Sequence, residues 1–104
     1  MCGTSMASPT ACGIGALLIQ DWRAQYPERA DMANSTLKAL LAHTAADLGN
    51  AGPDLQYGYG SIRTKAAVEH LRGDSHLEAE VSSGETFEFL VITYAGDEQL
   101  QITL

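Results

Sequence analysis

The chain has 104 residues, of which 45% are hydrophobic and 18% are charged, and this balance is typical of a folded domain rather than of a disordered chain. A chain of this length has room for about one domain with a small core. Its 13 acidic and 6 basic residues leave a formal net charge of −7, which argues against nucleic acid or an anionic membrane as a partner.

The first predicted element is a helix from Ser5 to about Ala24, whose first half is apolar on all sides. Such a helix needs to be covered all round. Gly13 and Gly15 each cost about 1 kcal/mol relative to alanine in a helix interior. Pro9 is tolerated near the start at the cost of a kink. The segment is therefore predicted to fold only within a surrounding domain.

Two further helices are predicted, from Asn34 or Ser35 to about Ala46 and from Thr64 to Leu71. The second helix has one amphipathic face, with side chains at i, i+3, i+4 and i+7: Leu37, Leu40, Leu41 and Thr44. A loop is predicted between these helices, at residues 47–60, because glycine, asparagine and proline are frequent there.

Two further predictions concern this loop. Gly58 and Gly60 are expected to permit a close approach of the backbone. Asp47 and Asp54 lack the regular spacing of oxygen ligands, so a solvated loop is predicted rather than a calcium site.

The composition changes at Gly73. Three half-buried strands are predicted beyond it, in residues 77–81, 87–94 and 100–104, because apolar and polar residues alternate or β-formers cluster there. The acidic side chains of this region are predicted to face water: Glu78, Glu80, Glu85 and Glu88.

Ser5 stands among small residues at the start of the first helix. The N-terminus of a helix offers free N–H groups and a positive dipole to an oxyanion, so this position suits a reactive hydroxyl. The alternative is that Ser5 only caps the helix. The seven residues Gly-Thr-Ser-Met-Ala-Ser-Pro resemble, at every position, the nucleophile motif of subtilisin-like serine peptidases (subtilases, peptidase family S8). Around Ser5 the motif is made of Gly3, Thr4, Met6, Ala7, Ser8 and Pro9.

The resemblance extends to about Leu71 through short motifs in the family's order: Lys38 to Leu41, Thr44 and Ala45, Asp47 to Gly49, and Gly58 to Gly60. Thr10 departs from the pattern, because the family most often has His after the motif's proline. The resemblance implies an α/β fold, with residues 1–72 forming the C-terminal part of a subtilisin-like three-layer parallel-sheet domain. Residues 73–104 would begin an accessory domain of the all-β sandwich type, and the sequence looks cut at both ends.

The resemblance also implies a function. Ser5 would be the nucleophile of a serine endopeptidase that forms an acyl-enzyme, and its backbone N–H would donate to the oxyanion. The family's triad runs Asp, His, Ser along the chain, so the Asp, the His and the oxyanion Asn would lie upstream of Met1. His43 with Asp47 or Asp54 is rejected as a substitute, because it lies in a helix and in the reverse order. We therefore expect the fragment alone to be inactive; the alternative is a noncatalytic binding module or pseudoenzyme that retains the serine motif.

The remaining expectations concern cofactors, partners and location. No cofactor and no metal site is assigned, although members of the family often bind calcium. The partners implied are a polypeptide substrate and the remainder of the catalytic domain, with no nucleic acid and no membrane. The family implies an extracellular location, and no signal peptide is recognised in this chain. Cys2 and Cys12 are expected to be buried free thiols, and His70 and His76 to be solvated or to cap a helix.

Overall fold

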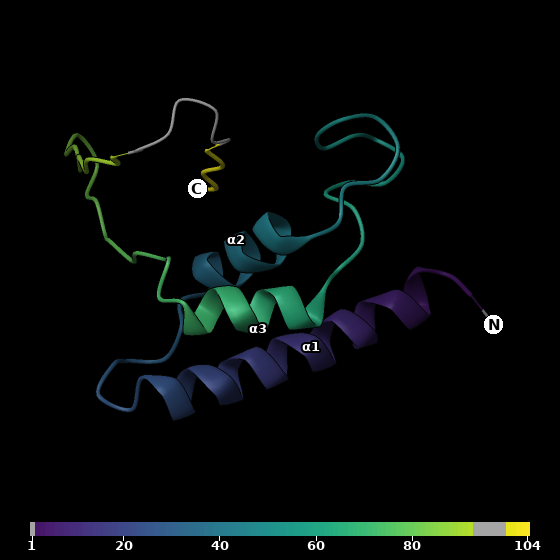
Figure 1. Ribbon diagram of the computed structural model, residues 1–104, viewed down its shortest axis with the longest axis horizontal. Coiled ribbons are helices and arrows are strands. Elements are labelled where there is room, and N and C mark those ends of the chain that lie inside the picture. The colour runs from purple at the N-terminus through teal and green to yellow at the C-terminus, as the bar shows by residue number, and fades with distance from the viewer. Residues whose placement is uncertain (1, 93–99) are drawn as a thin grey trace.

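The computed structural model describes residues 2–92 and 100–104. This part of the chain contains three helices, α1 (Thr4–Gln25), α2 (Asn34–Thr44) and α3 (Thr64–Arg72). α3 packs against both α1 and α2, and the N-terminal half of α1 extends beyond them (Figure 1). The three helices predicted from the sequence are confirmed, with ends that differ by two residues or fewer.

A small core holds the three helices together. Its fully buried or nearly buried side chains come from all three helices and from the connection after α1: Leu18, Trp22, Met32, Leu40, Ala67 and Leu71. Around it pack partly buried side chains that include Leu37 and Leu41 of the predicted amphipathic face. Tyr26 links two of the helices, because its hydroxyl donates a 2.6 Å hydrogen bond to the carbonyl of Leu71.

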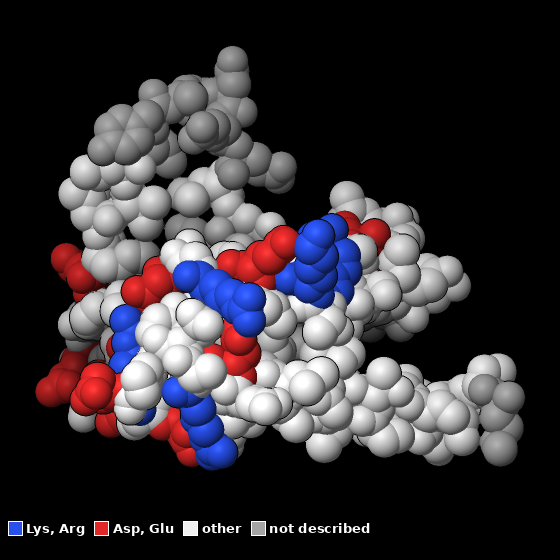
Figure 2. Space-filling view, turned by 60° about the horizontal axis from the view of Figure 1, so that its bottom comes forward, with Lys and Arg blue, Asp and Glu red and all other residues white. Residues whose placement is uncertain are grey.

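The N-terminal half of α1 lies outside this core. The buried residues of α1 begin at Gly15, and residues 2–10 are all exposed. No charged residue occurs between Cys2 and Gln20, so this half forms an uncharged arm, seen at the lower right in Figure 2. The prediction that Cys2 and Cys12 are buried is wrong here, since both thiols are free and exposed on the uncovered arm.

α2 ends two residues before the predicted position because the chain enters an isolated β-bridge. Ala45 is extended, and Ala46 and Ser61 exchange backbone hydrogen bonds of 2.8 and 2.9 Å. Gly60 has a φ of +104°, and a Cβ atom there would lie 2.0 Å from the carbonyl oxygen of Ala46. The predicted close approach of the backbone is thus confirmed at Gly60, and the absence of a side chain there allows the bridge between Ala46 and Ser61 to form.

The loop between α2 and α3 is organised by its carboxylates. Asp54 accepts hydrogen bonds from the backbone N–H groups of Asn50, Gln56 and Tyr57, at 3.1, 2.8 and 2.7 Å. Asp47 accepts one from Gly52 at 2.7 Å. The donation from Tyr57, reinforced by the other two, lowers the pKa of Asp54 below its ordinary value. The predicted loop is confirmed, and its acidic groups bind its own backbone.

The strands predicted after Gly73 are not found. Residues 73–92 and 100–104 contain no strand, and residues 93–94 of the predicted middle strand lie outside the described residues. A strand is stable only when its N–H and C=O groups pair with a neighbouring strand, and the described part of the chain supplies no such neighbour. The acidic side chains predicted to face water are exposed: Glu78, Glu80, Glu85 and Glu88. The apolar side chains predicted to be half-buried are exposed as well, since Leu77 and Val81 are 65% and 50% exposed. Glu78 also contacts the start of α2.

Candidate nucleophile at the start of α1

Ser5 is the second residue of α1 and is exposed. The N-cap position is occupied by Gly3, whose φ of +139° is readily adopted only by glycine. The carbonyl of Gly3 accepts hydrogen bonds of 3.1 Å from the N–H groups of Met6 and Ala7. Ser5 is therefore not the cap of this helix, and the cap-only interpretation of its hydroxyl is wrong.

The backbone around Ser5 leaves hydrogen-bonding groups free. The first N–H groups of any helix have no acceptor within the helix, and those of Thr4 and Ser5 precede the first bond to Gly3. Pro9 has no N–H to donate to the carbonyl of Ser5. An anion placed beside Ser5 would thus find N–H donors already aligned along the helix axis.

The electrostatic surroundings also favour an anion at this end. The first turn of α1 contains no acidic residue, so the positive end of the helix dipole is not neutralised locally. Thr10, which stands where the family most often has His, donates a 2.9 Å hydrogen bond from its hydroxyl to the carbonyl of Met6. The hydroxyl of Thr10 is therefore engaged within α1.

The described residues do not bring a general base to Ser5. Among them, no side-chain hydrogen bond of Ser5 is present, and His43 makes its contacts elsewhere. Its Nδ1 lies 3.0 Å from the hydroxyl of Thr103, and its ring centroid lies 4.8 Å from that of His70. Burial, with a smaller effect of His70, lowers the pKa of His43. Asp47 and Asp54, its conceivable carboxylate partners, hold the loop backbone instead.

Two general features of the described part bear on its chemistry. Within residues 2–92 and 100–104, no helix is long and apolar enough to cross a membrane. In the same residues, no cluster of three or more His, Cys, Asp or Glu side chains has the arrangement needed to hold a metal ion.

Residues 1–60 match the model of the subtilase family, Peptidase S8. The chain belongs to this family, and the resemblance predicted from Gly3 to Pro9 and the motifs that follow is confirmed. The described part of this chain is helical and contains no strand.

Curated relatives agree with this assignment. The chain is 36% identical over 66 residues to an extracellular serine protease of Serratia marcescens. The matched stretch covers 64% of this chain and 6% of the relative. The chain is 38% identical over 66 residues to the Neisserial autotransporter lipoprotein NalP of Neisseria meningitidis, again over 64% of this chain and 6% of the relative. Identity reaches 41% over 64 residues with the minor extracellular protease Epr of Bacillus subtilis, over 62% of this chain and 9% of the relative. The chain thus spans less than a tenth of these relatives, and no solved structure matches it significantly.

Some contacts that shape this part of the molecule could not be predicted from the sequence. The sequence could have indicated the N-cap position of Gly3, because a glycine directly precedes the motif's Thr-Ser pair. The contacts of Asp74, His76 and Glu78 had none, because their partners lie more than forty positions away in the sequence.

Proposed function

We propose that this chain is the part of a serine endopeptidase that carries the nucleophile, Ser5, within a longer parent protein. The observation that carries the proposal is the position of the Ser5 hydroxyl, exposed in the first turn of a helix with free N–H groups. The motif from Gly3 to Pro9 and the subtilase match over residues 1–60 support the same assignment.

In this proposal the reaction follows the serine-peptidase sequence. A base takes the proton of the Ser5 hydroxyl, and the oxygen attacks the carbonyl carbon of the scissile peptide bond. The resulting oxyanion accepts a hydrogen bond from the backbone N–H of Ser5, and its collapse expels the amine, which takes the proton from the base. Water then hydrolyses the acyl-enzyme ester and restores the hydroxyl.

The base, the carboxylate that orients it and the side-chain oxyanion donor would come from the remainder of the catalytic domain. A serine hydroxyl without an adjacent base is a poor nucleophile near neutral pH, so the isolated 104 residues are proposed to be inactive. The substrate would be a polypeptide held mainly by the rest of the parent. An extracellular location is supported by the relatives from Serratia and Bacillus, both of which are extracellular proteases.

We further propose a division of the chain at Gly73. Residues 1–72 would complete the subtilisin-like catalytic domain, whose parallel sheet would cover the uncharged arm of α1. Residues 73–104 would open an accessory β domain, and their strands would form only when paired with strands outside this chain. This division is supported by the change of composition at Gly73 and by the end of α3 at Arg72.

A fluorophosphonate probe, which reacts with activated serines, tests the function. In the full-length parent we expect mass spectrometry to find the label on Ser5. The label should be lost in Ser5→Ala and kept in Ser83→Ala, which removes an exposed serine far along the chain. The isolated 104 residues should not be labelled. A folded parent that is never labelled at Ser5 would refute the peptidase proposal and favour the noncatalytic alternative.

A further inference from the structure

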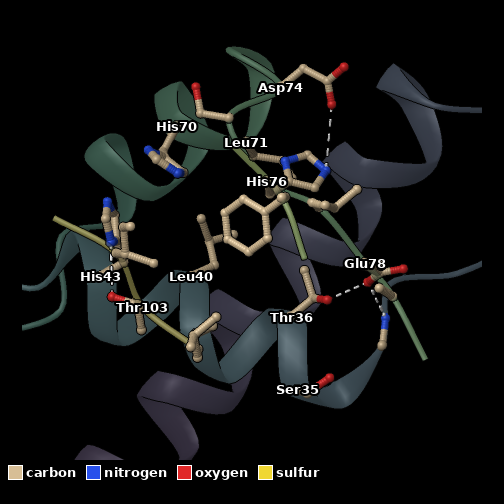
Figure 3. Close-up of a pocket in the computed structure, with 18 of the residues that line it drawn as sticks. Ser35, Thr36, Leu40, His43, His70, Leu71, Asp74, His76, Glu78 and Thr103 are labelled. Atoms are coloured by element: carbon tan, nitrogen blue, oxygen red, sulfur yellow. Dashed lines mark hydrogen bonds and ion pairs between the residues drawn. The ribbon is translucent and has the colours of Figure 1, made fainter. Parts of the chain in front are cut away.

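The segment directly after α3, residues 74–78, runs along the helical body, and the side chain of His76 at its centre faces the helices (Figure 3). We call this segment the clasp. At its first residue, the carboxylate of Asp74 accepts hydrogen bonds of 3.1 and 3.3 Å from the guanidinium of Arg29, in the connection after α1. Asp74 has a φ of +52°, so the chain turns here as it leaves α3. The Arg29 guanidinium lowers the pKa of Asp74, which keeps this ion pair formed in mild acid.

The last residue of the clasp caps a helix. The N-cap residue of α2 is Ala33, which has no side chain that can cap. Glu78 fills this role, because its carboxylate accepts a 2.9 Å hydrogen bond from the Ala33 N–H and another from the hydroxyl of Thr36. A carboxylate is favoured here by the positive end of the helix dipole, so the clasp stabilises α2 as well as itself.

His76, at the centre of the clasp, is packed between aromatic rings of α1. Its ring centroid lies 5.0 Å from that of Trp22 and 5.7 Å from that of Tyr26. Its side chain is only 12% exposed. Among the described residues, neither of its ring nitrogens has a hydrogen-bond partner. A neutral imidazole places one N–H donor in this slot, whereas an imidazolium would place two there, with the Asp74 carboxylate, 3.7 Å from Nε2, as the nearby counter-charge.

Charged groups near His76 act in both directions. Burial has the largest effect and lowers its pKa below the ordinary 6.5. Two carboxylates raise the pKa of His76: that of Asp74, whose Oδ1 lies 3.7 Å from Nε2 of His76, and that of Glu78. Arg29 and His70 of α3 lower the pKa further. The hydroxyl of Tyr26, a further titratable group on this face, donates to the carbonyl of Leu71 and makes no hydrogen bond to His76.

We propose that the clasp is an acid-sensitive latch: protonation of His76 releases residues 74–78 from the helical body. The inference stands on the packing of His76 and does not depend on the peptidase proposal. Release would expose Trp22 and remove the Glu78 cap from α2. The position of the segment after Gly73 relative to the helices would therefore depend on pH.

The direction of the pH dependence follows from proton linkage. The released imidazole has the ordinary pKa near 6.5, and the clasped imidazole has a lower one. The clasped state is therefore fully favoured above about pH 6.5, because neither state is then protonated. As the pH falls from there through the lowered pKa, the released state binds the proton more strongly. The equilibrium constant for closing the clasp then falls by up to about tenfold per pH unit.

Two readouts in the 104-residue chain test the latch between pH 8 and pH 5. Trp22 is the chain's single tryptophan and is 2% exposed, so release should shift its emission to the red. The Ala33 amide, which donates to Glu78, should lose protection against hydrogen exchange over the same pH range, after correction for the intrinsic rate. The two signals together distinguish release from quenching of Trp22 by a protonated imidazole that stays in place.

His76→Phe keeps an aromatic ring in the slot and removes the titration, so both transitions should disappear. His76→Gln, a neutral polar replacement, provides a second nontitrating variant if Phe packs badly. His70→Gln is the matched control, because it removes a histidine outside the slot, and it should keep both transitions. The proposal is overturned if the nontitrating variants retain the wild-type transitions, or if the Ala33 amide stays protected while the emission of Trp22 changes.

Discussion

The contact between Gly60 and Ala46 makes a sharp prediction about the loop that joins α2 to α3. In Gly60→Ala the new Cβ would lie 2.0 Å from the Ala46 carbonyl oxygen, so the bridge between Ala46 and Ser61 would have to open. A left-handed backbone costs a non-glycine residue about 1–2 kcal/mol. Each of the two lost backbone hydrogen bonds contributes about 1 kcal/mol. We therefore expect Gly60→Ala to lower the free energy of unfolding by about 3–4 kcal/mol.

Gly58→Ala is the matched control for this prediction. Gly58 also has a positive φ, of +59°, but a Cβ there meets nothing within 4 Å. Only the backbone cost of about 1–2 kcal/mol should then apply. Urea unfolding followed by Trp22 emission, at one fixed low protein concentration, measures both variants. Equal losses of stability in the two variants would refute the reasoning, because the steric overlap with Ala46 would then have no effect.

Two further predictions concern surface electrostatics and the arm of α1. Asp54→Asn should make the stability of the fold less dependent on pH in the acid range. A carboxylate with a lowered pKa stabilises the fold fully above its ordinary pKa of 3.8 and loses that effect as the pH falls through the lowered pKa. An unchanged pH dependence of thermal unfolding would contradict the hydrogen bonds assigned to Asp54. The uncharged arm should make the 104-residue chain associate, and Leu17→Lys, at a side chain that is 55% exposed on the arm, should weaken this association in sedimentation velocity. Leu55→Lys, at a fully exposed loop residue, should not, and a wild-type chain that stays monomeric at every concentration would contradict the idea.

The sequence allowed the helices and the loop to be predicted because their signals are local. The face formed by Leu37, Leu40 and Leu41 repeats with the period of a helix. Asp54 and the glycines near it form a loop through contacts with residues only a few positions away. The nucleophile motif around Ser5 is also a run of consecutive residues, and for that reason it could be recognised without any coordinates.

The predicted strands failed for a different reason. Alternation of apolar and polar residues records which side chains suit a half-buried strand, but pairing requires another strand. In residues 73–92 and 100–104 no pairing partner is present. Leu77 is therefore exposed, and the residue of this segment that packs on the helices is His76.

The sequence by itself thus determined the family, the nucleophile candidate and the three helices, since each depends on neighbours along the chain. Only the tertiary structure decided that the Cys2 and Cys12 thiols are exposed. It alone joined Glu78 to the start of α2 and placed His76 between two aromatic rings. Those contacts join residues more than forty positions apart, and their energies depend on burial and on facing charges, which no local pattern in the sequence encodes.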